Sequence, residues 1–174
     1  QLILAPLRGS LYLGVLLTAT LFATATGIIG ASVTVMGLMA APTMMKAGYD
    51  PKMSAGAIAA GGTLGILIPP SVMLVVMGPV VGVSIIKLFA AAIIPGLILA
   101  GLYVSYCMVR SHLDPKLGPP LPREMWATSV GQIVKEFAAG IVPMATIMFA
   151  SLGSIIFGLA TPTEAAAMGA AGAV

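Results

Sequence analysis

Charged residues are scarce in this sequence. They make up 7% of its 174 residues, whereas an average soluble domain carries roughly 25%. Eight Lys and Arg and five Asp and Glu are too few to cover a water-facing surface of this size. Hydrophobic residues make up 59% of the chain, and its mean hydropathy is +1.11. The composition therefore excludes an ordinary soluble domain and predicts a protein embedded in a lipid bilayer.

Cysteine and aromatic residues are also rare. The single cysteine, Cys107, excludes a disulfide framework and a metal site built from several thiolates. Aromatic residues amount to 6%, and the apolar stretches lack strict alternation, which argues against a membrane β-barrel with its aromatic girdles. The net charge of +3 arises from scattered basic residues, which argues against nucleic acid as a partner. We therefore expect an all-α membrane protein, a polytopic helical bundle.

A long uncharged stretch separates Arg8 from Lys46, and two glycines interrupt it near its middle. Each half has roughly 15 residues, which at about 1.5 Å per residue reach about 22 Å. This length is shorter than the ~30 Å hydrocarbon core of a bilayer. We expect a re-entrant hairpin over residues 9–45 with its tip at residues 27–32. A single helix with a small-residue packing seam and two full crossings are the alternatives.

Residues 46–52 carry strong turn signals. Gly48 is suited to end the preceding helix, and Asp50 is suited to cap the following one with Pro51 at its first position. We therefore expect the next helix to begin at residue 51.

Two adjacent prolines, Pro69 and Pro70, interrupt the uncharged stretch that follows. They exclude an unbroken helix, because each proline removes a backbone donor and clashes with the preceding turn. We expect a broken transmembrane helix over residues 51–78, in two halves joined by an unwound linker near residues 65–71. Residues 78–82, which hold two glycines and a proline, then predict an exit loop.

The remaining chain divides by its charges. Residues 84–109 predict a conventional transmembrane helix, and residues 110–136 predict a charged, proline-rich loop followed by an amphipathic segment. Residues 137–160 predict another transmembrane helix. The segment Thr161-Pro162-Thr163-Glu164 predicts a capping box, so residues 161–174 are expected to be the start of a truncated helix.

The basic residues test this map. If the hairpin returns to the side from which it entered, seven of the eight basic residues fall on one face of the membrane, and only Lys87 lies opposite. This asymmetry follows the positive-inside rule, which places Lys and Arg in cytoplasmic loops. Two full crossings in place of the hairpin put the charges on the same sides, so the rule supports the orientation and leaves re-entry open.

Two interrupted spans so close in sequence indicate a binding site. Unwound backbone at membrane depth is tolerated where it is buried in protein or lines an aqueous cavity, and secondary transporters build their midplane sites in this way. Close helix packing through small residues is the alternative explanation. The candidate substrate- and ion-binding residues are Thr26, Gly27, Gly30, Ser32, Thr63, Gly65, Pro69, Pro70 and Ser71.

Freed carbonyls and hydroxyls are ligands for a hard cation such as Na⁺. No Asp or Glu lies inside the predicted hairpin, broken helix or following helix, which favours sodium over a proton relay. The one histidine, His112, lies in the charged loop, so the serines have no nearby base. We therefore expect no enzyme and no cofactor, with Na⁺ as the coupling ion. The candidate sodium-site residues are Gly27, Ser32, Thr63 and Gly65.

Five motifs carry a family resemblance: Thr26-Gly27-Ile28-Ile29-Gly30-Ala31-Ser32-Val33, Lys46-Ala47-Gly48-Tyr49-Asp50, Gly62-Thr63-Leu64-Gly65-Ile66-Leu67-Ile68-Pro69-Pro70-Ser71, Gly82-Val83-Ser84 and Thr161-Pro162-Thr163-Glu164-Ala165-Ala166-Ala167. In order and spacing they resemble the large membrane subunit, the DctM-like M subunit, of tripartite ATP-independent periplasmic (TRAP) transporters. The resemblance covers nearly the whole sequence. It implies an internal fragment that holds most of the first of two inverted repeats.

The resemblance implies a sodium-coupled importer of an organic acid in the bacterial inner membrane. Its partners would be a small membrane subunit of the Q type and a periplasmic solute-binding protein that delivers the carboxylate substrate. The implied fold is of the elevator type, with residues 1–109 as half of the transport domain. The tip at residues 26–32 and the linker at residues 63–71 would together form one sodium site.

The tip resembles a branch of the family with the pattern Gly-Ile-Ile/Val-Gly-Ala-Ser. This likeness favours backbone carbonyls over side chains as sodium ligands. A channel-like or structural membrane subunit without a sodium site is the alternative function. An intramembrane hydrolase would need a base from another part of a longer chain.

Overall fold

The computed structural model describes residues 8–120 and, beyond them, residues 139, 142, 145–146, 149–150, 152–155, 157–161 and 164. Residues 8–120 form five α-helices, as the composition predicts: α1 (Ser10–Thr26), α2 (Ile29–Lys46), α3 (Pro51–Leu67), α4 (Val72–Val81) and α5 (Ile85–Leu113). The predicted amphipathic segment and most of the helices predicted at residues 137–160 and 161–174 lie outside the described residues.

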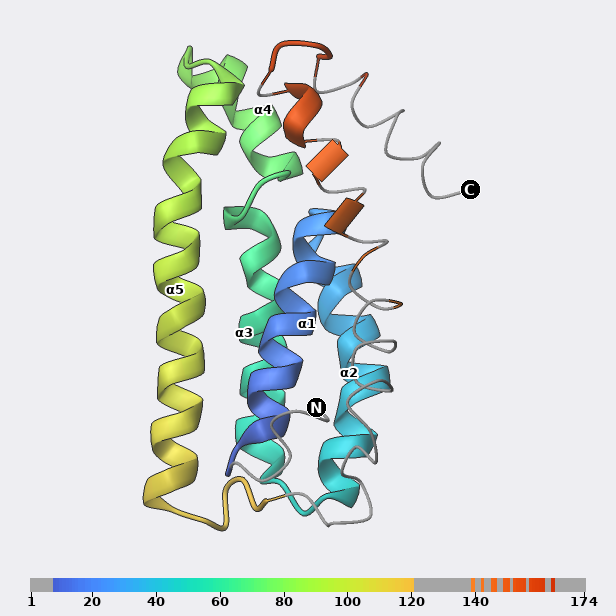
Figure 1. Cartoon of the computed structure of the whole chain (residues 1–174), viewed down its shortest axis with the longest axis vertical. Helices are drawn as coiled ribbons and strands as arrows, with labels where there is room; N and C mark the ends of the chain where they lie inside the picture. Colours follow the sequence, from blue (N-terminus) through green and yellow to red (C-terminus); the bar gives the residue numbers. More distant parts are fainter. Residues whose placement is uncertain are drawn as a thin grey trace.

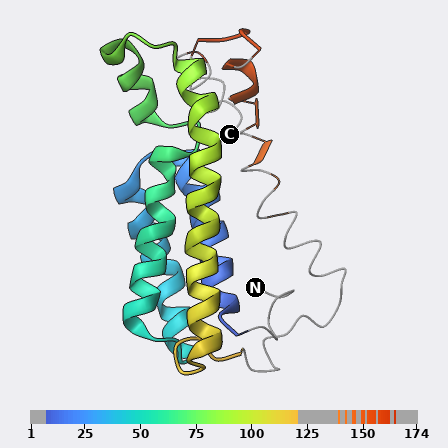
Figure 2. The same cartoon turned by 90° about the vertical axis from the view of Figure 1, so that its left-hand side faces the viewer.

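α1 and α2 run antiparallel as a hairpin, and α3 packs against both of them (Figure 1). α5 runs alongside α1 and α3, and α4 lies beyond α3 along the remaining length of α5 (Figure 2). One end of the bundle, called the base below, contains the start of α1, the end of α2, the start of α3 and the end of α5 (Figure 1). The antiparallel course of α1 and α2 excludes a single helix over this stretch.

Gly27 and Ile28 make the turn between α1 and α2. Gly27 has a left-handed φ of 63°, which glycine adopts without steric cost, and its N–H donates to the Ala23 carbonyl over 2.8 Å. Ile28 is extended, and its carbonyl accepts the N–H of Ser32 over 3.2 Å. The tip is therefore shorter than predicted. Residues 30–32 already belong to the first turns of α2, because one left-handed glycine is enough to end α1.

The turn into α3 has the features that its sequence predicts. Gly48 follows the end of α2 with a left-handed φ of 76°. The Asp50 carboxylate accepts the N–H of Met53 over 2.8 Å, and Pro51 occupies the first position of α3. Both helix ends are thus capped by nearby residues, which is why the sequence locates them well.

α3 and α4 form a bent pair with an angle of 43° between them. The last backbone bond of α3 runs from the Ile68 N–H to the Leu64 carbonyl over 2.9 Å. Pro69 and Pro70 have no N–H to continue this series, and the peptide bond between them is cis. The break therefore lies within the predicted linker.

The prediction of an exit loop over residues 78–82 is wrong. α4 continues to Val81, and Gly82 ends it with a left-handed φ of 69°. Gly78 instead has a packing role, because a β-carbon there would lie 2.6 Å from Cγ1 of Ile85. In the sequence, a glycine that allows α4 and α5 to pack closely thus cannot be distinguished from a glycine that forms a turn.

In the part of the chain that the structure describes, α5 alone is a single helix long and apolar enough to cross a membrane. Its 29 residues continue through Pro95 and, at about 1.5 Å each, extend over about 44 Å. The bent pair of α3 and α4 is a second candidate span, and α1 is a shorter apolar helix. The described helices are thus consistent with a membrane protein that contains a broken span.

Glycines on α3 let the hairpin approach closely. A β-carbon at Gly61 would lie 2.7 Å from Cβ of Ala19 on α1, and one at Gly62 would overlap Val33 on α2. Small residues have this packing role in membrane helices generally. The core around this contact consists of Leu11, Tyr12, Val15, Leu16, Ala19, Met36, Ala40, Met44, Tyr49, Ala57, Ile58 and Cys107.

The loop after α5 closes the base. The Gly9 N–H donates to the Gly118 carbonyl over 3.0 Å, and the Asp50 N–H donates to the Leu117 carbonyl over 3.2 Å. The Tyr12 hydroxyl donates to the same Leu117 carbonyl over 2.5 Å. The starts of α1 and α3 are therefore joined through this loop.

Basic residues gather at the base. Within the described chain, Lys87 alone among them lies at the opposite end, near the start of α5. This distribution agrees with the asymmetry predicted from the sequence. The basic residues at the base are Arg8, Lys46, Lys52, Arg110 and Lys116.

Candidate functional site

Four helix ends meet where the hairpin tip touches the break between α3 and α4. A β-carbon at Gly27 would lie 3.2 Å from the backbone nitrogen of Val72 and 3.6 Å from the carbonyl oxygen of Pro70. The end of α1 and the start of α2 therefore lie against the end of α3 and the start of α4. We call this contact the tip–break junction.

Two hydroxyls fasten the hairpin tip. The oxygens of Thr26 and Ser32 lie 2.8 Å apart in a hydrogen bond. The Thr26 oxygen also lies 3.3 Å from the Ala23 carbonyl oxygen, and the Ser32 oxygen lies 2.9 Å from the Ile28 carbonyl oxygen, so the two hydroxyl hydrogens serve two of these three contacts at a time. A hydroxyl has one donor hydrogen and two acceptor lone pairs. Acceptor capacity therefore remains on these oxygens after the tip is fastened.

Ser71 fastens the break. Because Pro70 has no N–H, the Ile66 carbonyl loses its usual helical partner, and the Ser71 hydroxyl donates to it over 2.6 Å. The same oxygen accepts the N–H of Leu74 at the start of α4, over 3.5 Å. Ser71 is 1% exposed. It therefore caps both half-helices, a role that the sequence did not distinguish from ligand binding.

Gly65 brings the end of α3 against the last turn of α1. A β-carbon at this position would overlap the carbonyl of Ala23. Pro69, four residues on, has no N–H, so the α3 helix supplies no donor to the Gly65 carbonyl. An oxygen without a helical donor thus lies close to the hairpin tip.

Two of the predicted site residues lie away from the junction. Thr63 follows Gly62, which faces α2, and the 100° step of an α-helix turns Thr63 away from the hairpin. Its hydroxyl donates to the Ala60 carbonyl of its own helix over 2.7 Å. Gly30 is exposed, and a β-carbon there would meet nothing within 4 Å.

The remaining predicted residues come together: Thr26, Gly27, Ser32, Gly65, Pro69, Pro70 and Ser71. Of the four candidate sodium-site residues, Thr63 is the one outside this set. Ala23 and Val72 belong to the junction but were missed, because their apolar side chains carry no sign of the contacts that their backbone atoms make there. The left-handed Gly27 was the available signal for Ala23, since a helix-ending glycine bonds the carbonyl four residues earlier.

The junction offers opposite partial charges on its helix ends. The last turns of α1 and α3 present carbonyl oxygens, which favour a cation, and the first turns of α2 and α4 present N–H groups, which favour an anion. Among the described residues, no three His, Cys, Asp or Glu side chains gather as metal ligands. Any cation here would therefore bind carbonyl and hydroxyl oxygens, the ligands that hard cations prefer.

The predicted capping box lies outside the junction. The Glu164 carboxylate accepts the N–H and the hydroxyl of Thr161, each over 2.8 Å, and the Glu164 N–H donates back to that hydroxyl over 3.4 Å. The backbone bond and then the hydroxyl bond lower the pKa of Glu164. Glu164 therefore has the structural role that its spacing predicts.

The sequence is similar to known transporter components. It matches the family described as "Tripartite ATP-independent periplasmic transporter, DctM component" over residues 2–174. It is 36% identical to the C4-dicarboxylate TRAP transporter large permease protein DctM of Pseudomonas aeruginosa over 166 residues, which are 94% of this chain and 37% of the relative. 

Two further relatives are named for other substrates. The ectoine TRAP transporter large permease protein TeaC of Halomonas elongata is 30% identical, over 92% of this chain and 36% of the relative. The isethionate TRAP transporter permease protein DctMQ of Oleidesulfovibrio alaskensis is 34% identical, over 96% of this chain and 25% of the relative. The chain thus spans between a quarter and about two fifths of these relatives' lengths.

Proposed function

The chain belongs to the DctM family of tripartite ATP-independent periplasmic transporters, and on this premise we propose that it is part of a sodium-coupled importer of an organic acid. The family consists of transporter components and not of enzymes, in agreement with the expectation from the sequence. The tip–break junction is the observation that carries the proposal. It combines oxygens for a cation with N–H groups for an anion in one place.

The proposed sodium ligands are mainly backbone oxygens. The Gly65 carbonyl has no helical donor, and the end of α1 contributes further carbonyls close to it. The hydroxyl oxygens of Thr26 and Ser32 retain acceptor capacity and lie on the same tip. Thr63 would join this set only after a rotation of α3, so we leave it out of the proposed site.

The proposed substrate is a carboxylate-bearing solute near the first turns of α2 and α4. Helix N-termini attract anionic groups, and transporters use broken helices for this purpose. The names of the relatives specify C4-dicarboxylates, ectoine and isethionate, so the family handles several small organic solutes. We propose that a periplasmic solute-binding protein selects and delivers the substrate.

The proposed assembly is a multi-pass permease in a bacterial inner membrane with a small Q-type membrane subunit. The relative named DctMQ supports this pairing, since its name joins the two subunits. The hairpin helices have 17 and 18 residues, or about 26 Å each at ~1.5 Å per residue, less than the ~30 Å hydrocarbon core. This length supports a hairpin that re-enters the bilayer, within an elevator-type transport domain to which residues 1–109 belong.

The test is uptake by the complete permease with its small subunit in proteoliposomes. Labelled C4-dicarboxylate is offered with and without the periplasmic binding protein, and with and without an inward sodium gradient; ectoine and isethionate are offered in parallel. We expect uptake that requires both the protein and the gradient. Uptake indifferent to sodium would refute the ion site and favour a channel-like subunit. If none of these solutes is taken up and Na⁺ does not change the thermal midpoint of the permease, a structural subunit is favoured.

A further inference from the structure

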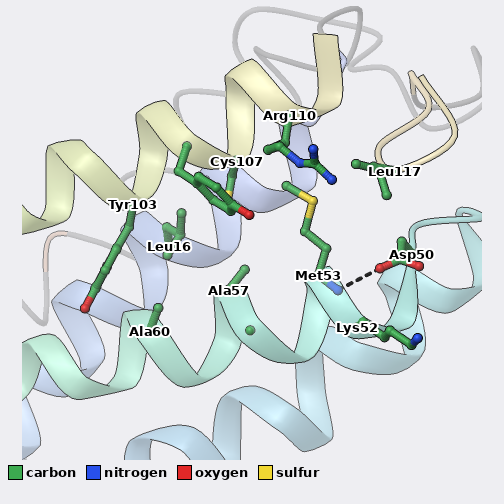
Figure 3. A pocket seen from close by; sticks show the side chains of 12 residues that line it. Leu16, Asp50, Lys52, Met53, Ala57, Ala60, Tyr103, Cys107, Arg110 and Leu117 are labelled. Atoms are coloured by element: carbon green, nitrogen blue, oxygen red, sulfur yellow. Dashed lines mark hydrogen bonds between the residues drawn. The ribbon is translucent and has the colours of Figure 1, made fainter. Parts of the chain in front are cut away.

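A cavity of about 620 Å³ lies between α3 and α5 near the base, with Leu16 of α1 in its wall (Figure 3). α3 and α5 touch closely near the break, where a β-carbon at Gly96 would lie 2.7 Å from Cγ1 of Ile68. Toward the base the space between them widens, and Leu117 of the closing loop contributes to its wall. The volume falls within the range of about 300–1,000 Å³ that is typical of ligand sites.

The base end of the cavity carries two cations. Lys52 from the start of α3 and Arg110 from the end of α5 both line it, and neither forms an ion pair with another described residue. Asp50 also lines it, but its carboxylate already accepts the N–H of Met53 as the cap of α3 (Figure 3). The lining therefore has two cations and one carboxylate, and Figure 3 shows the Lys52 side chain extending away from Arg110, past Asp50, to the outer rim of the cavity.

The other end of the cavity is apolar. Leu16, Ala57 and Ala60 line it together with Tyr103 of α5, and Figure 3 shows these residues farther from Asp50 than Met53 is. Tyr106 lines the cavity as well and is 63% exposed, as is typical of an aromatic residue at the membrane interface. The cavity thus changes from cationic at the base to apolar toward the middle of the bundle.

We propose that this cavity binds an anionic phospholipid of the leaflet at the base. The phosphate lies beside Arg110, with Lys52 at the outer rim of the base end, and one acyl chain follows Ala57, Ala60 and Tyr103. Basic pockets between membrane helices on the cytoplasmic side bind such headgroups. The apolar extension distinguishes a lipid from a soluble phosphate, and the excess of cations over carboxylates distinguishes an anionic lipid from a zwitterionic one. The proposal is independent of the ion and substrate site.

The test uses the complete permease with its small subunit in detergent, titrated with phosphatidylglycerol. Bound lipid is counted by native mass spectrometry, and the thermal midpoint is followed in the same samples. We expect one retained lipid per permease and a rise in the midpoint. The double variant Lys52→Gln/Arg110→Gln should weaken apparent affinity about 30-fold, since each basic residue near anionic lipid contributes about a factor of five.

A matched double variant, Lys46→Gln/Lys116→Gln, removes two charges from the base that do not line the cavity. It should retain the lipid. Ala60→Leu keeps both cations but narrows the apolar part, and it should weaken lipid binding while leaving the midpoint without lipid nearly unchanged. If the Lys52→Gln/Arg110→Gln double variant does not fold, the same measurements are made on Ala60→Leu and on the single variants Lys52→Gln and Arg110→Gln.

Several outcomes would overturn the proposal. An equal loss in the matched double variant would mean diffuse attraction of lipid to the base. Binding of phosphatidylethanolamine as tight as that of phosphatidylglycerol would refute a preference for anionic lipid. Equal stabilisation by glycerol 3-phosphate would identify a soluble phosphate as the ligand instead. Complete absence of retained lipid would mean that the cavity binds no lipid in the assembled transporter, and retention unaffected by every variant would place the lipid elsewhere on the permease.

Discussion

At Gly27 the backbone conformation and the packing impose the same requirement. Its φ of 63° disfavours any residue with a β-carbon, and such a carbon would press against Val72. Gly30, three residues on, has an ordinary helical conformation and open space around it. The two glycines of the same motif therefore differ in what they contribute, and a pair of substitutions separates them.

We expect Gly27→Ala to lower the free energy of unfolding by at least about 1–2 kcal/mol, the cost of a left-handed L-residue. Gly30→Ala should be neutral or stabilise α2 by about 0.5–1 kcal/mol. Thermal midpoints of the complete permease in detergent, with and without Na⁺, measure both effects. Equal midpoints for the two variants would show that the tip does not have the geometry described.

Ser71 and Ser84 form a second informative pair, since both precede a helix. The Ser71 hydroxyl bonds the Ile66 carbonyl and the Leu74 N–H, whereas Ser84 makes no side-chain cap bond to α5. We expect Ser71→Ala to destabilise the protein by about 0.5–2 kcal/mol, the usual cost of a lost cap, and Ser84→Ala to have little effect. Chemical unfolding, followed by tryptophan fluorescence or by the helical circular-dichroism signal, would measure the stability of both variants. A larger loss of stability in Ser84→Ala than in Ser71→Ala would contradict these roles.

Residue roles that depend on neighbours within a few positions were predictable from the sequence. The Asp50 cap and the Thr161–Glu164 capping box use spacings of three residues, and both are present. The contact between Gly65 and Ala23 joins two helices, so no local pattern revealed it. The double capping by Ser71 depends on how the backbone passes through Pro69 and Pro70, which the composition of the linker does not specify.

Among the elements, α3 is distinguished by a different neighbour on each side. Gly61 faces α1, Gly62 faces α2, and Ala60 lines the cavity toward α5. The sequence left two explanations for the small residues of this stretch, a binding site and close packing. The structure assigns packing to Gly61 and Gly62, whereas Gly65 both packs and contributes to the tip–break junction.

A substitution on α3 tests this division. Gly62→Ala places a β-carbon on Val33 and should cost about 1–3 kcal/mol through overpacking. Gly56→Ala, on the same helix with nothing within 4 Å, should stabilise it by about 0.5–1 kcal/mol. Thermal midpoints distinguish the two. Tolerance of alanine at both positions would indicate that α2 and α3 are not in close contact.

Orientation is a property of the whole molecule. The described basic residues gather at the base, with Lys87 at the opposite end. From the positive-inside rule we propose that the base faces the cytoplasm. The sequence predicted this arrangement because charge counting needs no knowledge of packing. It left open whether α1 and α2 were one helix or two, which their antiparallel packing resolves.

Cysteine labelling checks the orientation. In a cysteine-free background of the complete permease, which includes Cys107→Ala, Lys87→Cys should react with an impermeant maleimide from the periplasmic side of spheroplasts. Lys46→Cys and Lys116→Cys should react only after the membrane is permeabilised. Labelling of Lys46→Cys and Lys87→Cys from the same side would contradict the orientation proposed here.

The closing loop also constrains the order of events during synthesis. The bond from the Tyr12 hydroxyl to the Leu117 carbonyl joins residues 105 positions apart. At about 5–20 residues per second, a ribosome needs about 5–20 s to make the intervening chain. For the later part of that interval, once Lys46 has been added, the first helical hairpin is complete but lacks the loop that joins its start to α3. Its early survival must therefore depend on the contacts of α1 and α2 with each other and with α3, and the closing loop secures an arrangement that has already formed.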